Sequence, residues 1–190
     1  MAKEELLVVD GYNMIGAWPE LIKLKNQEKM EDARDELLHE LSNYAHYEGI
    51  GVRVVFDAQF VPGIQKTYDR YTLEVIFTKE GETADSYIER TVGEENQLIT
   101  HVTVATSDLA EQWMIFQKGA SRKSAKELYK DVRHTKKKIR TDFHTYQPPD
   151  KFRSTFSDED LIKLRSFYEK MILPKPISSQ KSPVGKRKNK

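Results

Sequence analysis

Three aspartates follow short apolar runs and are the residues of this sequence best placed to do chemistry. They are Asp10 after Leu6–Val9, Asp57 after Val52–Phe56, and Asp108 shortly after Val102–Ala105. Such runs are typical of strands buried on both faces of a parallel sheet. Because the carboxyl ends of parallel strands share one edge, we expect the three acids to meet there. Asp85, in the first turn of a predicted helix, is expected to reach the same edge, with Glu82 one turn earlier.

Carboxylates that converge on one spot repel each other unless a cation offsets their charge. Mg²⁺ or Mn²⁺ is the natural candidate, because hard cations prefer oxygen ligands and need only a few carboxylates plus water. Such ions activate a water and stabilise the leaving oxygen of a phosphodiester. The four acids together therefore predict a metal site, although each acid taken singly is more typical of a turn or a helix cap.

Three polar residues near these acids are candidates for contacts to water or phosphate. Asn13 is predicted to orient a water or a phosphate, and its alternative role is that of a turn residue bonded to its own backbone. Thr83 and Ser107 stand at predicted helix N-termini, where free backbone N–H groups favour anions. Their alternative role is that of helix caps. Gly11 allows a tight backbone passage directly after Asp10.

The elements that must position these residues alternate between strand and helix patterns. Strands are predicted at 6–9, 52–56, 73–77, 102–105 and 119–120, and helices at 28–48, from 83, at 108–118, 124–140 and 158–171. Residues 59–71 are predicted to form a loop. This alternation favours a single α/β fold with a mostly parallel sheet and helices on both faces. Residues 174–190 hold three prolines, six basic residues and no acid, which predicts a disordered basic tail.

Four short motifs carry a resemblance to a known family. They are Val9-Asp10-Gly11-Tyr12-Asn13, Phe56-Asp57-Ala58, Glu82-Thr83-Ala84-Asp85 and Ala105-Thr106-Ser107-Asp108. In this order and spacing they resemble the YacP-type branch of the NYN domains, which are relatives of PIN-domain nucleases. The similarity runs from about residue 6 to residue 140. It implies a PIN-like three-layer α/β sandwich and a metal-dependent endoribonuclease.

The resemblance also implies a role for individual residues. Asp10, Asp85 and Asp108 would bind the metal, Asp57 would be a supporting acid, and Asn13 and Ser107 would line the site. The YacP branch is associated with bacterial ribosomes and with cleavage of mRNA during translation. Mg²⁺ or Mn²⁺ is therefore the expected cofactor, and mRNA and the ribosome are the expected partners. On this basis we expect a nuclease domain at 1–146, a C-terminal helical extension at 147–173 and the basic tail at 174–190. The extension and the tail lie outside the matching part.

The basic residues are concentrated in the last third of the chain. Residues 1–120 hold 11 Lys and Arg against 22 Asp and Glu, whereas residues 121–190 hold 20 against 8. Along the predicted helix 124–140, four cations recur at spacings of three and four, which places them in one stripe. They are Lys126, Lys130, Arg133 and Lys137. We expect this stripe to hold RNA phosphates, because such contacts supply affinity without reading sequence; the alternative is a solvated helix face.

The predicted loop 59–71 interleaves aromatic and basic side chains. Tyr68 and Tyr71 stand beside Lys66 and Arg70. Aromatic and basic residues in alternation suit the stacking of bases of single-stranded RNA. Packing of these aromatics onto the domain is the equally good alternative.

Composition excludes several classes of function. The chain has no cysteine, which excludes disulfides, thiolate metal sites and cysteine nucleophiles. Its longest apolar runs, such as Leu6–Val9, are too short to cross a membrane, and a secretory signal is not seen, so a cytoplasmic protein is expected. No pair of histidines has zinc-site spacing. Gly11 and Gly16 lack the spacing of a dinucleotide-binding turn, so no nucleotide cofactor is expected.

A non-catalytic RNA- or ribosome-binding protein is the main alternative function. Such a protein would keep the basic stripe and the basic tail and would use the acids only as caps. Replacement of Asp85 by Asn distinguishes the two, because it affects cleavage and leaves a binding surface intact.

Overall fold

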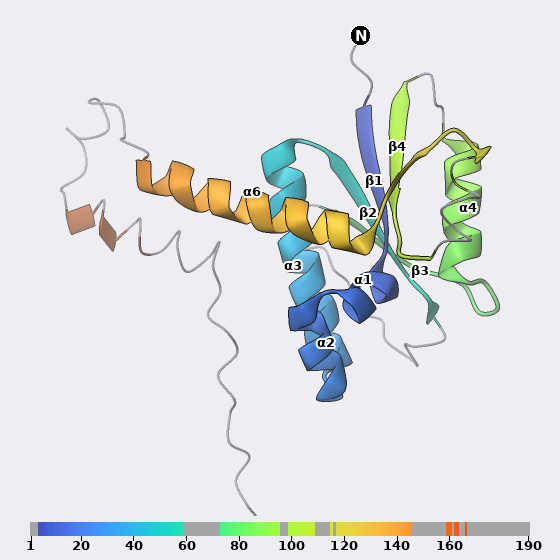
Figure 1. Cartoon of the computed structure of the whole chain (residues 1–190), viewed down its shortest axis with the longest axis horizontal. Helices are drawn as coiled ribbons and strands as arrows, with labels where there is room; N and C mark the ends of the chain where they lie inside the picture. Colours follow the sequence, from blue (N-terminus) through green and yellow to red (C-terminus); the bar gives the residue numbers. More distant parts are fainter. Residues whose placement is uncertain are drawn as a thin grey trace, which may run out of the picture. The chain divides into compact units, whose positions relative to one another are not determined.

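The strand β1 (Glu4–Asp10) lies at the centre of a five-stranded sheet in the computed structural model (Figure 1). Its Leu-Val-Val run is buried because both faces of the sheet are covered, as the absence of alternation predicts. The structure describes residues 4–58, 73–95, 99–108, 115, 117–145 and, further on, 159, 160, 162, 163 and 166.

All five strands are parallel, in the order β3-β2-β1-β4-β5. The other four strands are β2 (Gly51–Phe56), β3 (Glu74–Phe77), β4 (Thr100–Ala105) and β5 (Ser121–Lys123). In the register, Asp10 pairs with Val55 and its neighbour Val9 pairs with Ala105. The strands that precede Asp10, Asp57 and Asp108 therefore end side by side, which confirms the predicted α/β class with a parallel central sheet.

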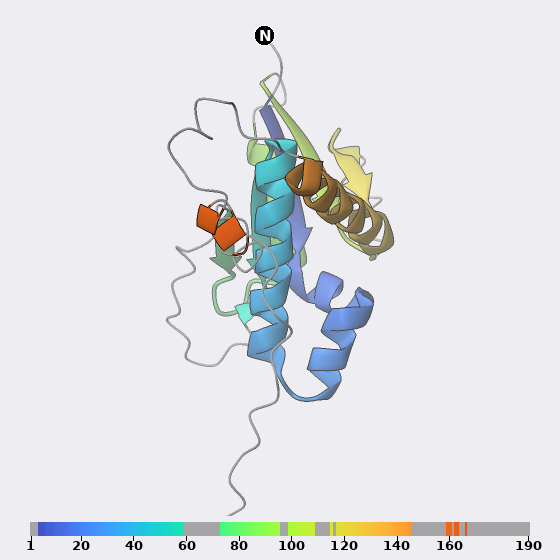
Figure 2. The same ribbon diagram turned by 90° about the vertical axis from the view of Figure 1, so that its left-hand side faces the viewer.

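Helices cover both faces of this sheet, giving three layers. One face packs against α1 (Gly11–Ala17), α2 (Pro19–Asn26), α3 (Met30–Glu48) and α6 (Ala125–Thr145). The opposite face packs against α4 (Ala84–Glu94) and Ile115. Successive β1 residues divide between the two cores, with Val9 in the first and Val8 in the second. Figure 1 shows α3 and α6 on one side of the sheet and α4 on the other, and Figure 2 shows α3 and α6 in front of the strands.

Two features differ from the sequence prediction. The helices α1 and α2 were not predicted, because Asp10-Gly11 looks like the end of an element rather than the start of a helix. The predicted strand 119–120 is wrong, and β5 begins only at Ser121. Gly119 has φ of +78°, and the Ala120 N–H donates to the Ile115 carbonyl at 3.3 Å, so these residues close a helical turn instead.

Several predicted segments lie partly or wholly outside the described residues. Residues 115 and 117 are helical within the predicted helix 108–118, and the five described residues between 159 and 166 are helical. The loop 59–71 and the tail 174–190 lie outside. By its internal contacts the chain divides into two units, Met1–Thr145 and Tyr146–Lys190. Within the described part of the chain, no helix is long and apolar enough to cross a membrane.

Candidate active site at the carboxyl edge of the sheet

Asp10 is the most buried acid at this edge, with only 8% of its surface exposed. It ends β1 and caps α1, and its Oδ1 accepts a hydrogen bond from the Asn13 N–H at 3.0 Å. An acid at this position satisfies a free N–H of the helix and so explains why a helix starts directly after the strand. The capping role predicted as the alternative is therefore present, on a carboxylate that also faces other acids.

Burial raises the pKa of the Asp10 carboxyl from 3.8 to about 6. The bonds from Asn13 and Tyr12 lower this pKa, whereas the negative charges of Asp85 and Asp57 raise it further. Loss of solvent disfavours the charged form, and like charges nearby act in the same direction. The charged form of the Asp10 carboxyl is therefore disfavoured, as is expected at a site that binds a cation.

Asp85 lies in the first turn of α4 and is more exposed than Asp10. Its pKa is raised first by partial burial, then by Asp108 and then by Asp57. Because Asp85 also raises the pKa of Asp10, it is electrostatically linked to all three strand-end acids. The structure thus brings the four predicted acids to one edge.

Thr83 caps α4, since its Oγ1 accepts from the Ser86 N–H at 3.2 Å. This bond agrees with the capping alternative for Thr83, and its role at a phosphate stays a prediction. Glu82 pairs with Arg90 at 2.9 Å and is thereby engaged along α4.

Asn13 connects the turn after β1 to the turn after β4. Its side-chain Oδ1 accepts a hydrogen bond from the Ser107 N–H at 3.0 Å, across 94 positions of sequence. Next to it, the Asp108 N–H donates to Thr106 Oγ1 at 3.1 Å. Asn13 and Ser107 are thus brought together, and the Asn13 side-chain oxygen holds the backbone beside Asp108 rather than its own turn. The expectation that Asn13 binds water or phosphate stays a prediction.

Aromatic rings pack closely around Gly11, the residue after Asp10. A Cβ on Gly11 would stand 2.2 Å from the Phe56 ring, so glycine is required by close packing rather than by its φ angle. Tyr12 contacts Phe56 edge-on with centroids 5.2 Å apart, and its hydroxyl accepts from Arg34 Nη1 at 3.2 Å. Arg34 is itself buried, with 3% exposed. The packing role of Phe56 and the contact of Arg34 were not predicted, because both depend on residues distant in sequence.

The donor set suits a hard divalent cation, although the acids are not gathered into a finished cage. Among the described residues, no group of three or more His, Cys, Asp and Glu side chains is arranged to hold a metal ion. Mg²⁺, however, is usually bound through one or two carboxylates, several waters and substrate phosphates. Four oxygen-donor side chains whose charges disfavour one another fit such an open site.

The basic helix α6 begins at this same edge. Lys123 ends β5 beside Ala105 of β4, and its carbonyl accepts from the Thr106 N–H at 3.0 Å. Ser124 and Glu127 form a capping box that starts the helix, with the Glu127 N–H bonded to Ser124 Oγ at 3.2 Å. The Trp18 indole N–H donates to the Ala125 carbonyl at 3.0 Å and fixes this first turn against α1 and α2.

The four predicted stripe residues are all exposed on α6, away from its buried residues. They are Lys126, Lys130, Arg133 and Lys137. Arg133 lies 3.7 Å from a Glu20 carboxylate and above the Tyr129 ring, so part of its charge is engaged within the protein. The other predicted RNA contacts, Lys66, Tyr68, Arg70 and Tyr71, lie outside the described residues.

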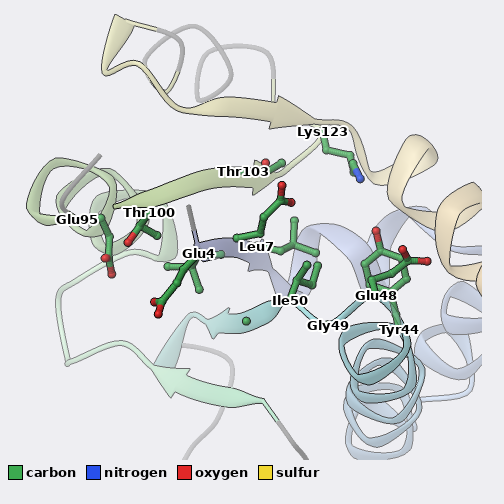
Figure 3. Close-up of a pocket in the computed structure, with 13 residues that line it drawn as sticks. Glu4, Leu7, Tyr44, Glu48, Gly49, Ile50, Glu95, Thr100, Thr103 and Lys123 are labelled. Atoms are coloured by element: carbon green, nitrogen blue, oxygen red, sulfur yellow. The ribbon is translucent and has the colours of Figure 1, made fainter. Parts of the chain in front are cut away.

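A groove of about 820 Å³ lies elsewhere, along the sheet face from the amino ends of β1 and β2 toward Lys123 (Figure 3). Its acidic residues are Glu4, Glu5, Glu48 and Glu95. Glu48 accepts from Thr135 Oγ1 at 2.6 Å, and Glu95 lies 3.4 Å from Arg53 Nη1. None of the four aspartates lines this groove. The groove and the carboxyl edge are therefore two separate acidic regions of the protein.

The carboxyl edge agrees with what comparison with known proteins finds. The family model described as the YacP-like NYN domain matches residues 7–169. The chain belongs to the YacP-like NYN domain family. This confirms the resemblance inferred from the four motifs and corrects its extent, because the match continues past residue 140 through most of the predicted extension at 147–173.

Similar proteins with this domain come from Bacillus subtilis. The uncharacterized protein YacP of strain 168 is 50% identical over 135 residues, which are 71% of this chain and 79% of that protein. The crystal structure of Rae1 (YacP) has a TM-score of 0.66 and 43% identity, covering 87% of this chain and 90% of that one. A mutant of Rae1 has the same TM-score with 40% identity and covers 85% and 99%. The four aspartates therefore lie on a nuclease-like NYN fold.

Proposed function

We propose that this protein is a metal-dependent endoribonuclease that cleaves single-stranded RNA, with mRNA on the translating ribosome as its substrate. The observation that carries the proposal is the gathering of Asp10, Asp57, Asp85 and Asp108 at one edge, where burial and then the neighbouring carboxylate charges raise the pKa values of Asp10 and Asp85. Without a bound cation, the four carboxylates would repel a polyanionic substrate from this edge. Membership of a nuclease-like family supports this reading.

In the proposed mechanism, Asp10, Asp85 and Asp108 would hold Mg²⁺ or Mn²⁺, and Asp57 would be a supporting acid. Such an ion supplies Lewis acidity and lowers the pKa of water. Asp10 is largely ionised at neutral pH, since its pKa is about 6, and so is available to hold a cation. Lys126 and Lys130 on the first turns of α6 would bind RNA phosphates close to this edge. The expected products carry 5′-phosphate and 3′-hydroxyl ends.

Asp85→Asn is the direct test, because it removes one charge at nearly constant shape. We expect cleavage to fall by at least ~100-fold, since a missing ligand removes several kcal/mol of transition-state stabilisation. Wild type and variant are compared with Mn²⁺ on one mRNA, offered both free and engaged on ribosomes. Glu5→Gln is the matched control, because it neutralises a groove acid instead of an edge acid.

The outcomes separate the two candidate functions. Cleavage by wild type and Glu5→Gln, abolished by EDTA and by Asp85→Asn, supports the nuclease. Products with 2′,3′-cyclic phosphate ends and activity in EDTA contradict the metal mechanism. An RNA- or ribosome-binding protein without activity is the alternative, favoured by the capping bond of Asp10 and the exposed cations of α6. This alternative predicts that neither the wild type nor any variant cleaves RNA, while all of them still bind it.

A further inference from the structure

Thr78, directly after β3, binds the backbone on both sides of Asp57. The Thr78 N–H donates to the Phe56 carbonyl at 3.0 Å, and its Oγ1 accepts from the Ala58 N–H at 3.0 Å. Asp57 thus lies between two residues that are both bonded to one threonine. Thr78 is buried, with 5% of its surface exposed, so both bonds are shielded from competing water.

The first of these bonds extends the sheet, and the second does not. Phe56 pairs with Phe77 at the last position of the β2–β3 ladder, and their rings stack with centroids 5.5 Å apart. The bond from Thr78 N–H to Phe56 continues that ladder by one step. The Ala58 N–H, by contrast, lies beyond the strand and is satisfied by a side chain. A side chain with an acceptor hydroxyl, and not merely any strand residue, is therefore needed at this place.

A related but more local bond occurs at a second strand end, between residues two positions apart. Thr106 follows β4, is fully buried, and its Oγ1 accepts from the Asp108 N–H at 3.1 Å. In both places a buried threonine hydroxyl accepts a backbone N–H at or next to a strand-end acid. The two threonines come from neighbouring parts of one sheet edge, where backbone direction decides how the carboxylates meet.

We infer that Thr78 is a positioning residue for Asp57, an inference that rests on the proposed nuclease function. The pair of bonds from Thr78 fixes the backbone of Asp57 and thereby the place from which its charge acts on Asp10 and Asp85. Supporting contacts of this kind affect activity by roughly 10–100-fold when removed. Thr78 itself does not touch the substrate, so its replacement acts on the rate of the bound complex rather than on binding.

Thr78→Val is the informative variant, because it keeps the β-branched shape and the backbone N–H but deletes the acceptor. Thr78→Ser keeps the acceptor and tests rescue. Thr135→Val is the matched control, since it deletes another buried hydroxyl, one that donates to the groove acid Glu48 at 2.6 Å. If Thr78→Val does not fold, Thr78→Ala deletes the same acceptor without placing a methyl group against the Ala58 N–H.

We expect cleavage by Thr78→Val to be about 10-fold slower at saturating RNA, with KM unchanged. Thr78→Ser and Thr135→Val should remain within about 2-fold of wild type. Hydrogen exchange of the Ala58 amide, followed by NMR without RNA or metal, should accelerate in Thr78→Val and Thr78→Ala only. An equal decrease in Thr78→Ser, an unchanged rate in Thr78→Val, or an equal decrease in Thr135→Val would overturn the positioning role.

The amide measurement separates the two hypotheses. If the wild type does not cleave RNA, the proposed function fails, while faster exchange at Ala58 still shows that Thr78 holds the Asp57 turn. If the wild type cleaves but exchange at Ala58 is unaffected by Thr78→Val, the positioning role fails and the nuclease stands.

Discussion

Two regions of this molecule carry four acids each, and their surroundings differ. At the carboxyl edge, burial raises the pKa values of Asp10 and Asp85, and the charges of neighbouring aspartates raise them further. In the groove, Glu48 receives a hydrogen bond from Thr135, Glu95 lies beside Arg53, and Glu4 and Glu5 are exposed. The two regions have the same number of acids. The candidate catalytic site differs because its surroundings disfavour the charged form of Asp10 and Asp85.

This difference indicates that the carboxyl edge lowers the free energy of unfolding of the metal-free protein. A buried carboxylate that faces other carboxylates destabilises the native state unless a cation arrives. A glutamate that accepts a hydrogen bond or lies beside an arginine does not carry that cost to the same degree. Sites for function are commonly places where stability has been given up in this way. Matched substitutions in the two regions test whether they differ as described.

Asp10→Asn should raise stability, and this is the largest effect expected. A carboxyl whose pKa rises from 3.8 unfolded to about 6 folded stabilises the protein only when protonated, and that stability is lost as the pH rises through about 6. Asparagine keeps an acceptor for the Asn13 N–H without the charge. We expect a gain of about 3 kcal/mol at pH 7, from a shift of about 2 pKa units, and little gain near pH 4.

Urea unfolding of the metal-free protein between pH 4 and pH 8 measures this gain. Glu48→Gln in the groove is the control, and it should leave stability unchanged or lower it, since it weakens the bond from Thr135. An equal gain in unfolding free energy for both variants would contradict the proposed difference between the edge and the groove. Addition of Mn²⁺ should stabilise the wild type and leave Asp10→Asn unaffected.

Gly11→Ala should destabilise the carboxyl edge, with an intermediate effect. The added Cβ would lie 2.2 Å from the Phe56 ring, and overpacking of this kind costs roughly 1–3 kcal/mol. The matched change in the groove is Gly51→Ala, whose Cβ would meet atoms no closer than 3.5 Å. Thermal unfolding should therefore separate the two variants. A tolerated Gly11→Ala would show that the edge is less tightly packed than the structure indicates.

Lys130→Gln should have the smallest effect, on RNA affinity alone. Removal of one phosphate-binding cation lowers the slope of log affinity against log salt by about 0.7 for a single strand. Titration of fluorescent RNA at several salt concentrations measures this slope. Lys25→Gln on α2 is an exposed control that should leave it unchanged. Equal slopes for both variants would remove α6 as the surface that brings RNA to the edge.

Much of the sheet was predictable because its strands are marked by local sequence. Continuous apolar runs ending in Asp10 and Asp57 indicated both the parallel sheet and the place of the acids. The strand β5, by contrast, is short and polar, and only its pairing with β4 makes it a strand. A sequence window contains no information about such a partner.

The parts of the site that escaped prediction are those made by distant contacts. Thr78 meets Ala58 twenty positions away, and the Phe56 ring excludes a side chain at position 11. Helix α1 depends on the Asp10 cap and on burial of Met14 and Ile15, so its seven residues carry little helical signal of their own. Residue type indicates what can do chemistry, and packing decides how it is held.

The order of strands across the sheet also sets when the site can exist. The central strand β1 is made first, yet its two neighbours are β2 and β4, and β4 is separated from it by some ninety positions of chain. Asp108 cannot join Asp10 until that late strand has docked, and α6 with its cations follows later still. The four aspartates are therefore not gathered at the edge for most of the chain's synthesis, and a chain truncated before β4 lacks Asp108 altogether.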